Sequence, residues 1–252
     1  MCCFTGPVRS VTDTKIFARP GKGHQQFLVY RMSYQANNSV AMVLPLPVKP
    51  GAGEDAVKFI DLKEYPNFFG DLESGFPHED VGVNSEARGA VPALASAHLA
   101  VVEVGDFEAS FVPTVKDFSR LDARFRLPDS AWKDLPDYKD FGFAVFKLKP
   151  EAHDVHPMAF SFPRRDASLF YPTVHIHDGK VHARAKFDHV LYGQPATDTD
   201  FIFHGWEESA SHAESFVQIG KTKGVIAPQL HCYKKVLTGT LKNQDTVIAN
   251  AA

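Results

Sequence analysis

Apolar residues in this chain recur in short runs, often alternating with polar residues, and this pattern constrains the fold more than any other feature. A period of two is typical of strands with one buried face. The run from Val40 to Val48 is apolar at every position, as in a strand buried on both faces. Its two prolines place the end of that strand at a sheet edge or at the exit from the sheet. We predict strands at Lys15–Ala18, Phe27–Tyr34, Val40–Leu46, Leu99–Val104, Glu108–Val112, Phe141–Leu148, Met158–Phe162, Thr173–His177, Val181–Phe187, Phe201–His204 and Val236–Leu241.

Helical patterns are few. Glu54–Leu62 and Pro66–Leu72 are short candidates, and a turn or two is expected from Asp129 to Leu135. The clearest helix runs from Val115 to Phe125, where Thr114 and the acidic residue three positions later form a capping-box pattern. The predicted fold class is therefore α+β, a mostly antiparallel β-sheet with a few short helices.

Length and composition indicate one folded domain. The chain has 252 residues, a formal net charge of −3 and 21 phenylalanines, which supply more apolar surface than disordered chains carry. We predict a single domain over residues 1–242 and a polar tail over 243–252 that frays, with a two-lobed chain divided near residue 150 as the alternative. The stretch from Ser74 to Pro92 has no period, and loops of this length are usually functional or poorly ordered.

The sequence also predicts a compartment and excludes some partners. No secretory signal is visible, and the longest apolar run is far shorter than the ~20 residues of a membrane-spanning helix. Three cysteines cannot form a disulfide framework, so we expect a reduced, cytoplasmic protein. The near-neutral charge and the pI of about 6.4 give no support for a nucleic-acid partner. Whether the protein is an enzyme stays open at this point, as does its oligomeric state.

A histidine-rich segment carries the strongest hairpin pattern in the chain. Asp178 and Gly179 lie between two alternating stretches, which favours a two-residue type I′ turn. In that register His175 faces His182, and His177 shares their face.

Three imidazoles on one patch can bind Zn or Cu. Lys180, Arg184 and Lys186 lie on the same face, so an acidic ligand or phosphate is an alternative. A solvated polar strand face without any ligand would have the same pattern.

The N-terminal cysteines form a second candidate site. If Met1 is removed, the free α-amine can act as the base for the Cys2 thiol. The start of the chain, with Cys2 and the stretch Thr14–Arg19, resembles N-terminal-nucleophile hydrolases of the penicillin-acylase and bile-salt-hydrolase type. The resemblance implies a β-hairpin, with Cys2 as nucleophile and Arg19 as the substrate-orienting residue. The chain lacks the aspartate that this family places after its arginine, and its sparse helices fit a four-layer hydrolase poorly.

A further hypothesis joins the two sites. Cys2 and Cys3 converge in it with the hairpin histidines on a soft metal ion. No spacing in the sequence demands this arrangement.

Several longer segments resemble a different family, and together they span most of the chain. Ala41-Met-Val-Leu-Pro-Leu-Pro47 is the most specific, and Tyr138–Leu148, Pro157–Phe162 and Leu169–Pro172 follow it. Over roughly residues 2–180 the chain resembles an uncharacterised bacterial domain family. It departs from that family in lacking an export signal and in carrying the histidine hairpin. The resemblance implies no reaction, ligand or catalytic residue.

The sequence therefore predicts binding of a metal ion (Zn or Cu) or of a small acidic ligand. The expected ligands are His175, His177 and His182, with Cys2 and Cys3 as additional ones. The alternative is an amide hydrolase that uses Cys2, and a purely structural or interaction role is the third hypothesis.

Overall fold

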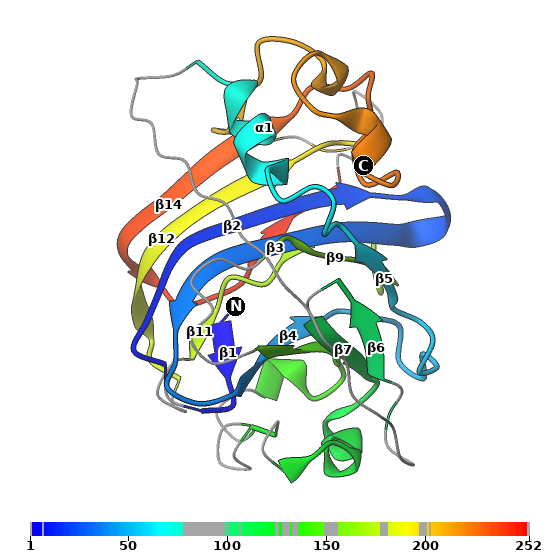
Figure 1. Ribbon diagram of the computed structural model, residues 1–252, viewed down its shortest axis with the longest axis vertical. Helices are drawn as coiled ribbons and strands as arrows, with labels where there is room; N and C mark the ends of the chain where they lie inside the picture. Colours follow the sequence, from blue (N-terminus) through cyan, green and yellow to red (C-terminus); the bar gives the residue numbers. More distant parts are fainter. Residues whose placement is uncertain are drawn as a thin grey trace.

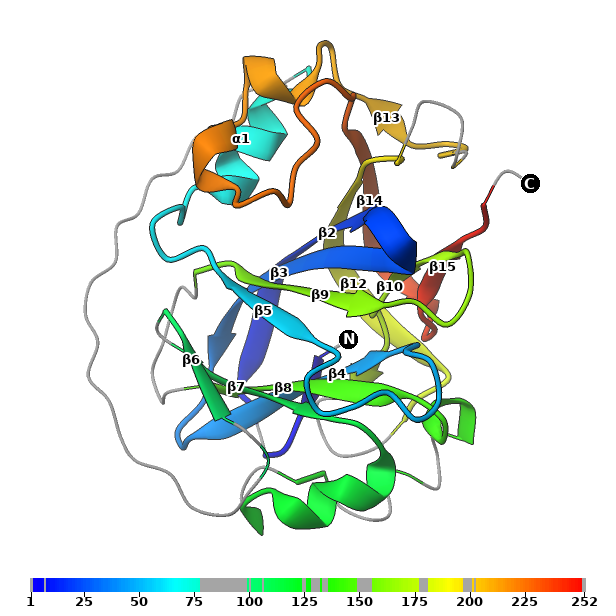
Figure 2. The ribbon, with the colours of Figure 1, turned by 90° about the vertical axis from the view of Figure 1, so that its right-hand side faces the viewer.

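The computed structural model describes residues 2–6, 8–77, 99, 101–105, 107–123, 126–127, 132, 136–148, 156–176, 181–196, 201 and 203–250, with only the backbone of Cys2. Figures 1 and 2 show two stacked β-sheets with short helices outside them. The strands are β1 (Cys2–Phe4), β2 (Ser10–Pro20), β3 (Gln25–Gln35), β4 (Val40–Leu46), β5 (Lys58–Asp61), β6 (Val101–Val104), β7 (Phe107–Val112), β8 (Gly142–Leu148), β9 (Met158–Pro163), β10 (Leu169–Tyr171), β11 (His175–Ile176), β12 (Arg184–Gly193), β13 (Glu207–Glu208), β14 (Tyr233–Lys242) and β15 (Thr246–Ile248). The helices are α1 (Phe68–Ser74) and the 3-10 helices η1 (Lys22–His24), η2 (Val115–Arg120), η4 (Pro136–Tyr138), η5 (Ala213–Ser215) and η6 (Ile219–Lys221).

The sheets are mostly antiparallel, as predicted, but both contain a parallel pair. The six-stranded sheet has the order β11-β1-β4-β8-β7-β6, and the seven-stranded sheet has the order β13-β14-β12-β2-β3-β9-β5. A further pair, β10-β15, stands apart from both. The parallel pairs are β1 with β11 and β2 with β12. Each of these pairs joins two segments that are far apart in the chain. The alternation of apolar and polar residues predicts a strand but not which distant strand it pairs with.

Apolar residues on both faces of the central strands explain the layers. In β4, Met42 and Leu44 face the core between the two sheets, whereas Ala41 and Val43 face the core outside the six-stranded sheet. The prediction of a strand buried on both faces is confirmed, because every residue of β4 is buried.

The outer face of the seven-stranded sheet is covered by α1 (Figure 1). The ring of Phe68 on α1 packs edge-on against Phe17 of β2, with the ring centroids 5.8 Å apart. This contact belongs to the third apolar core of the molecule.

The C-terminal end of α1 is fixed by a polar network. Lys234 Nζ lies 3.1 Å from Glu73 Oε1 and 3.0 Å from Glu207 Oε2, and the Tyr192 hydroxyl donates to Glu73 Oε2. Burial alone would raise the pKa of Glu73, but the hydrogen bonds from Tyr192 and Lys234 outweigh it and hold the pKa below its usual value. An ionised Glu73 therefore ties α1 to β12 and β14.

Some predicted elements are wrong. The segment predicted as a helix at Glu54–Leu62 contains strand β5, which pairs with β9. The predicted helix from Val115 is a 3-10 helix that ends at Arg120. Residues 201 and 203–204 form no strand, although Phe201 makes an isolated bridge to Asn250.

The prediction of a frayed tail over residues 243–252 is also wrong, because part of this segment forms a strand. Its β15 pairs antiparallel with β10, and Asp245 accepts the backbone N–H groups of Thr173 and Val174. Strands from before and after residue 150 share both sheets, for example β1 with β11 and β3 with β9. None of the helices in the described part of the chain is long and apolar enough to cross a membrane.

Candidate functional site

The N-terminal strand β1 lies inside the six-stranded sheet, between β4 and β11. Cys2 is the register partner of His175, and Cys3 is the partner of both Ile176 and Val43. His175 lies on the face of this sheet that looks toward the other sheet, because the next residue, Ile176, belongs to the outer apolar core. Cys3 is fully buried on the opposite face, in the outer apolar core. Cys3 and His175 therefore lie on opposite faces of one sheet.

A buried histidine pair bridges the two sheets at this point. The Nε2 atoms of His175 on β11 and His189 on β12 lie 2.9 Å apart, and the rings are stacked with an interplanar angle of 19°. The ring of Phe187 stands edge-on to both imidazoles. At this distance one imidazole donates its N–H and the other accepts it, so the pair requires at least one neutral ring.

The predicted pairing of His175 with His182 is wrong. β11 pairs with β1 in one sheet, whereas β12 belongs to the other. β14 pairs with β12 along its whole length, and β2 takes the second edge from His189 to Gly193. The side chain of His175 is only 8% exposed, whereas His182 is exposed. His177 and the predicted turn at residues 178 and 179 lie outside the described residues.

Asn243 nevertheless holds the backbones of these two histidines together. Its side-chain Oδ1 accepts the N–H of His175 at 2.7 Å. Its Nδ2 donates to the carbonyls of both His175 and His182 at 2.9 Å. The side-chain amide of Asn243 thus makes the hydrogen bonds that a neighbouring strand would otherwise make. Nothing in the local sequence distinguishes this asparagine from a solvated one.

Asp245 anchors the same segment. Its Oδ1 accepts the backbone N–H groups of Thr173 at 2.8 Å and Val174 at 3.0 Å, and its Oδ2 accepts the Tyr138 hydroxyl. Burial raises the pKa of Asp245, although these hydrogen bonds oppose the shift. Burial and the neighbouring carboxylate also raise the pKa of Tyr138. Sequence reasoning missed Asp245, which lies in a short polar stretch without a motif.

The described side chains alone do not complete a metal centre. Within the part of the chain that the structure describes, no group of three or more His, Cys, Asp or Glu residues could hold a metal ion. The structure brings His175 and His189 together, with Cys2 in register, but not His182 or Cys3. Binding of Zn or Cu stays a prediction, with His189 replacing His182 as the described partner of His175.

The predicted second catalytic residue lies elsewhere. Arg19 belongs to β2 in the seven-stranded sheet, so the β-hairpin implied by the hydrolase resemblance is not formed with β1. Its Nε donates to the carbonyl of Val225 at 2.7 Å, and a terminal nitrogen donates to that of Gly224 at 2.8 Å. Burial lowers the pKa of Arg19 to about 10. This guanidinium fixes the loop at residues 224–225.

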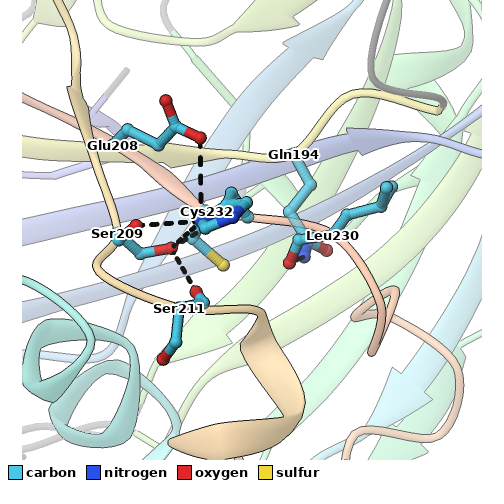
Figure 3. Close-up of polar contacts among 7 residues, drawn as sticks. Gln194, Glu208, Ser209, Ser211, Leu230 and Cys232 are labelled. Atoms are coloured by element: carbon cyan, nitrogen blue, oxygen red, sulfur yellow. Dashed lines mark hydrogen bonds and ion pairs between the residues drawn. The ribbon is translucent and has the colours of Figure 1, made fainter.

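A serine and a histidine meet in a second polar cluster, which Figure 3 shows. Ser209 Oγ lies 3.4 Å and Glu208 Oε1 lies 3.6 Å from the same nitrogen, Nδ1 of His231. A catalytic triad instead needs the hydroxyl and the carboxylate on different imidazole nitrogens. Ser209 Oγ also donates to the carbonyl of Ser211 at 2.7 Å and accepts the N–H of Cys232 at 3.0 Å. The cluster therefore closes a turn rather than activating a nucleophile.

Cys232 in this cluster is an unreactive thiol. It is fully buried, and burial raises its pKa to about 12. The thiolate, which is the nucleophile and metal ligand, is therefore scarce at neutral pH.

Comparison with known proteins relates the chain to one fold. No family model matches it. A crystal structure of baculovirus P35 matches with a TM-score of 0.51 at 12% identity, covering 99% of each chain. A mutated baculovirus P35 after caspase cleavage matches with a TM-score of 0.50 at 11% identity, covering 95% of this chain and 100% of that one. P35 in a complex with caspase-8 matches with a TM-score of 0.49 at 12% identity, covering 96% and 97%. The resemblances to a bacterial family and to N-terminal hydrolases stay predictions, and the likeness at this identity extends to the fold that the chain has in common with P35.

Proposed function

We propose that the protein is a partner of caspase-class cysteine proteases, which bind and cleave it and are thereby inhibited. The observation that carries the proposal is the likeness of fold to baculovirus P35 over 99% of both chains, together with a P35 structure obtained after caspase cleavage. The main partner proposed here is therefore a protein, whereas the sequence alone predicted a metal ion or a small acidic ligand.

The strand order supports inhibition rather than simple digestion. β1 to β5 and α1 precede residue 78, and β6 to β15 follow residue 98. Strands from the two sides pair in β1/β11, β4/β8, β2/β12 and β3/β9. One cut between α1 and β6 therefore leaves two fragments that remain folded together. In many enzymes product release limits turnover, and a cleaved chain that stays folded in one piece and leaves slowly would occupy the protease.

The cleavage site is proposed from the sequence. Caspases cleave the peptide bond after an aspartate. Residues 75–98 contain one aspartate, Asp80, within Pro77-His-Glu-Asp-Val81. Residues 78–98 lie outside the described residues, and Asp80 is proposed from its residue type and from its position in the chain between α1 and β6.

Asp80→Ala is the decisive variant. Wild-type protein is expected to inactivate one or more members of a panel of purified caspases near equimolar ratio, with fragments of residues 1–80 and 81–252 in the mass spectrum. Asp80→Ala is expected to stay uncut and to inhibit ~100-fold less well, as for the loss of a binding hot spot. The matched control is Asp55→Ala, because the Asp55 side chain is 90% exposed on a described turn. Cleavage without inhibition, cleavage elsewhere, or no effect on any caspase would contradict the proposal.

A second candidate function, binding of a soft metal ion, is favoured by the histidine pair. Two imidazole nitrogens that each lie ~2.0–2.1 Å from a tetrahedral Zn are separated by somewhat more than 3 Å. The Nε2 atoms of His175 and His189 are 2.9 Å apart, so a small outward shift would admit the ion. Cys2 is in register to provide a third ligand.

Metal analysis of the purified protein tests this candidate. One Zn or Cu per chain is expected, lost in His189→Asn and retained in His24→Asn, an exposed histidine on η1. Circular dichroism of both variants checks that the fold persists. Trace metal only, or equal loss in both variants, would reject it. The hydrolase alternative requires Cys2 as the first residue, so retention of Met1 in the intact mass would exclude it.

A further inference from the structure

We propose that a groove beside β15 binds an extended acidic peptide segment of a protein partner. The groove has a volume of about 400 Å³, within the range of ligand-binding pockets. It is lined by the turn before β13, by β14, and by β15 with the two residues after it. The lining residues are His204, Trp206, Lys235, Thr246, Val247, Ile248, Ala249 and Asn250.

The backbone of β15 offers an available strand edge. Within the described part of the chain, β15 pairs with β10 and with no second strand, and the one bridge beyond it joins Asn250 to Phe201. Figure 2 shows β15 at the margin of the molecule, close to the C-terminus. An exposed edge presents N–H and C=O groups to which an extended peptide can add as a further strand.

The charges of the groove select an acidic peptide. Its lining contains two basic side chains, His204 and Lys235, and no acidic one. The neighbouring Lys234 differs, because Glu73 and Glu207 already neutralise it. Among the described residues no carboxylate lies within ion-pair distance of Lys235, so its charge is available to a carboxylate from outside.

Apolar contacts in the groove are already in place. Trp206 is held by Tyr171 and Phe203, whose ring centroids lie 5.6 Å and 5.1 Å from its own. Val247 is 56% exposed, one of only four large hydrophobic side chains with such exposure in the described part of the chain. A pre-positioned indole beside an exposed valine provides an anchor for apolar side chains of the peptide. The favoured occupant therefore alternates acidic and apolar residues.

Fluorescence polarisation with a labelled synthetic peptide tests the proposal. The probe is fluorescein-Glu-Val-Glu-Val-Glu-Val-amide, and its lysine counterpart is the comparison. We expect saturable binding of the acidic peptide alone, weakened at least ~10-fold by Lys235→Glu and by Trp206→Ala. The matched control Lys242→Glu, at the far exposed end of β14 and outside the groove, is expected to bind as the wild type does.

A peptide with N-methylated alternate amides tests strand addition separately, and it is expected to lose binding because methylation removes the donors. No binding at ~1 mM probe, equal binding of the lysine peptide, or an equal loss in Lys242→Glu would each overturn the proposal. Undiminished binding of the N-methylated peptide would overturn strand addition. These measurements involve no protease, so their failure is distinguishable from failure of the caspase proposal.

Discussion

Replacing Phe146 by alanine is expected to lower the free energy of unfolding by ~3–5 kcal/mol. Phe146 on β8 is fully buried between the two sheets. Its ring centroid lies 5.6 Å from that of Phe59 on β5 and 5.9 Å from that of Phe160 on β9, both in the opposite sheet. A third contact, 6.1 Å, joins it to Phe107 on β7. Truncation therefore removes apolar burial and leaves a cavity where the two sheets meet.

Denaturant unfolding followed by circular dichroism measures the effect. Phe146→Leu keeps most of the side-chain volume and allows the core to repack. It is expected to lower the free energy of unfolding by less than ~1.5 kcal/mol. Val102→Ala serves as a surface control, because Val102 on the edge strand β6 is 45% exposed, and it is expected to change stability by less than ~0.5 kcal/mol. A loss below ~1 kcal/mol in Phe146→Ala would mean that the sheets do not depend on this aromatic contact.

Asp245→Ala is expected to destabilise the protein by ~3 kcal/mol or more. The substitution leaves the N–H groups of Thr173 and Val174 without their acceptor, and each buried polar group left unsatisfied costs ~1–3 kcal/mol. The Tyr138 hydroxyl loses its partner as well. Asp245→Asn keeps an acceptor oxygen at Oδ1, so its cost is expected to be smaller. Thermal and denaturant unfolding of the two variants provide the comparison, and equal losses would contradict the hydrogen-bond explanation.

The same residue predicts a pH dependence. Burial raises the pKa of Asp245 in the folded protein above 3.8, so between these two pKa values the folded state holds more protons than the unfolded state. The stability that comes from protonation of Asp245 is therefore fully present below pH 3.8 and is lost as the pH rises through the folded-state pKa, whereas the hydrogen bonds that its carboxylate accepts remain. Relative to Asp245→Asn, which cannot titrate, wild-type stability is expected to fall with rising pH across this window. Parallel stability curves for the two proteins would contradict the shift.

The position of a strand could be predicted from the local run of apolar residues where both faces of the strand are buried. β4 runs over Val40–Leu46 as predicted, because consecutive apolar residues have no alternative to burial in a two-faced strand. The short strand β5 was missed, since Lys58–Asp61 has a partly exposed, irregular burial pattern that a short helix would share. β1 and β15 were missed because three residues are too few to show a period.

The candidate site was predictable only in part. The sequence pointed to Cys2 and His175, and the structure places them in register on parallel strands. The pairing of His175 with His182 failed because a turn pattern predicts local pairing, whereas β12 pairs with β14 and β2 instead. His189 had little to distinguish it in the sequence, because its role depends on a contact across two sheets.

The sequence by itself determined that this protein is rich in antiparallel strands and that β4 is buried on both faces. It also singled out Cys2 and His175 as candidate site residues. These properties depend on residue type and on periods of a few residues. Tertiary structure alone decided the parallel pairs, the hydrogen bonds that Asp245 accepts, the bridge between His175 and His189, and the groove beside β15. Each of these joins segments distant in the chain, and their pairing depends on the free energy of the whole packed core rather than on any local preference.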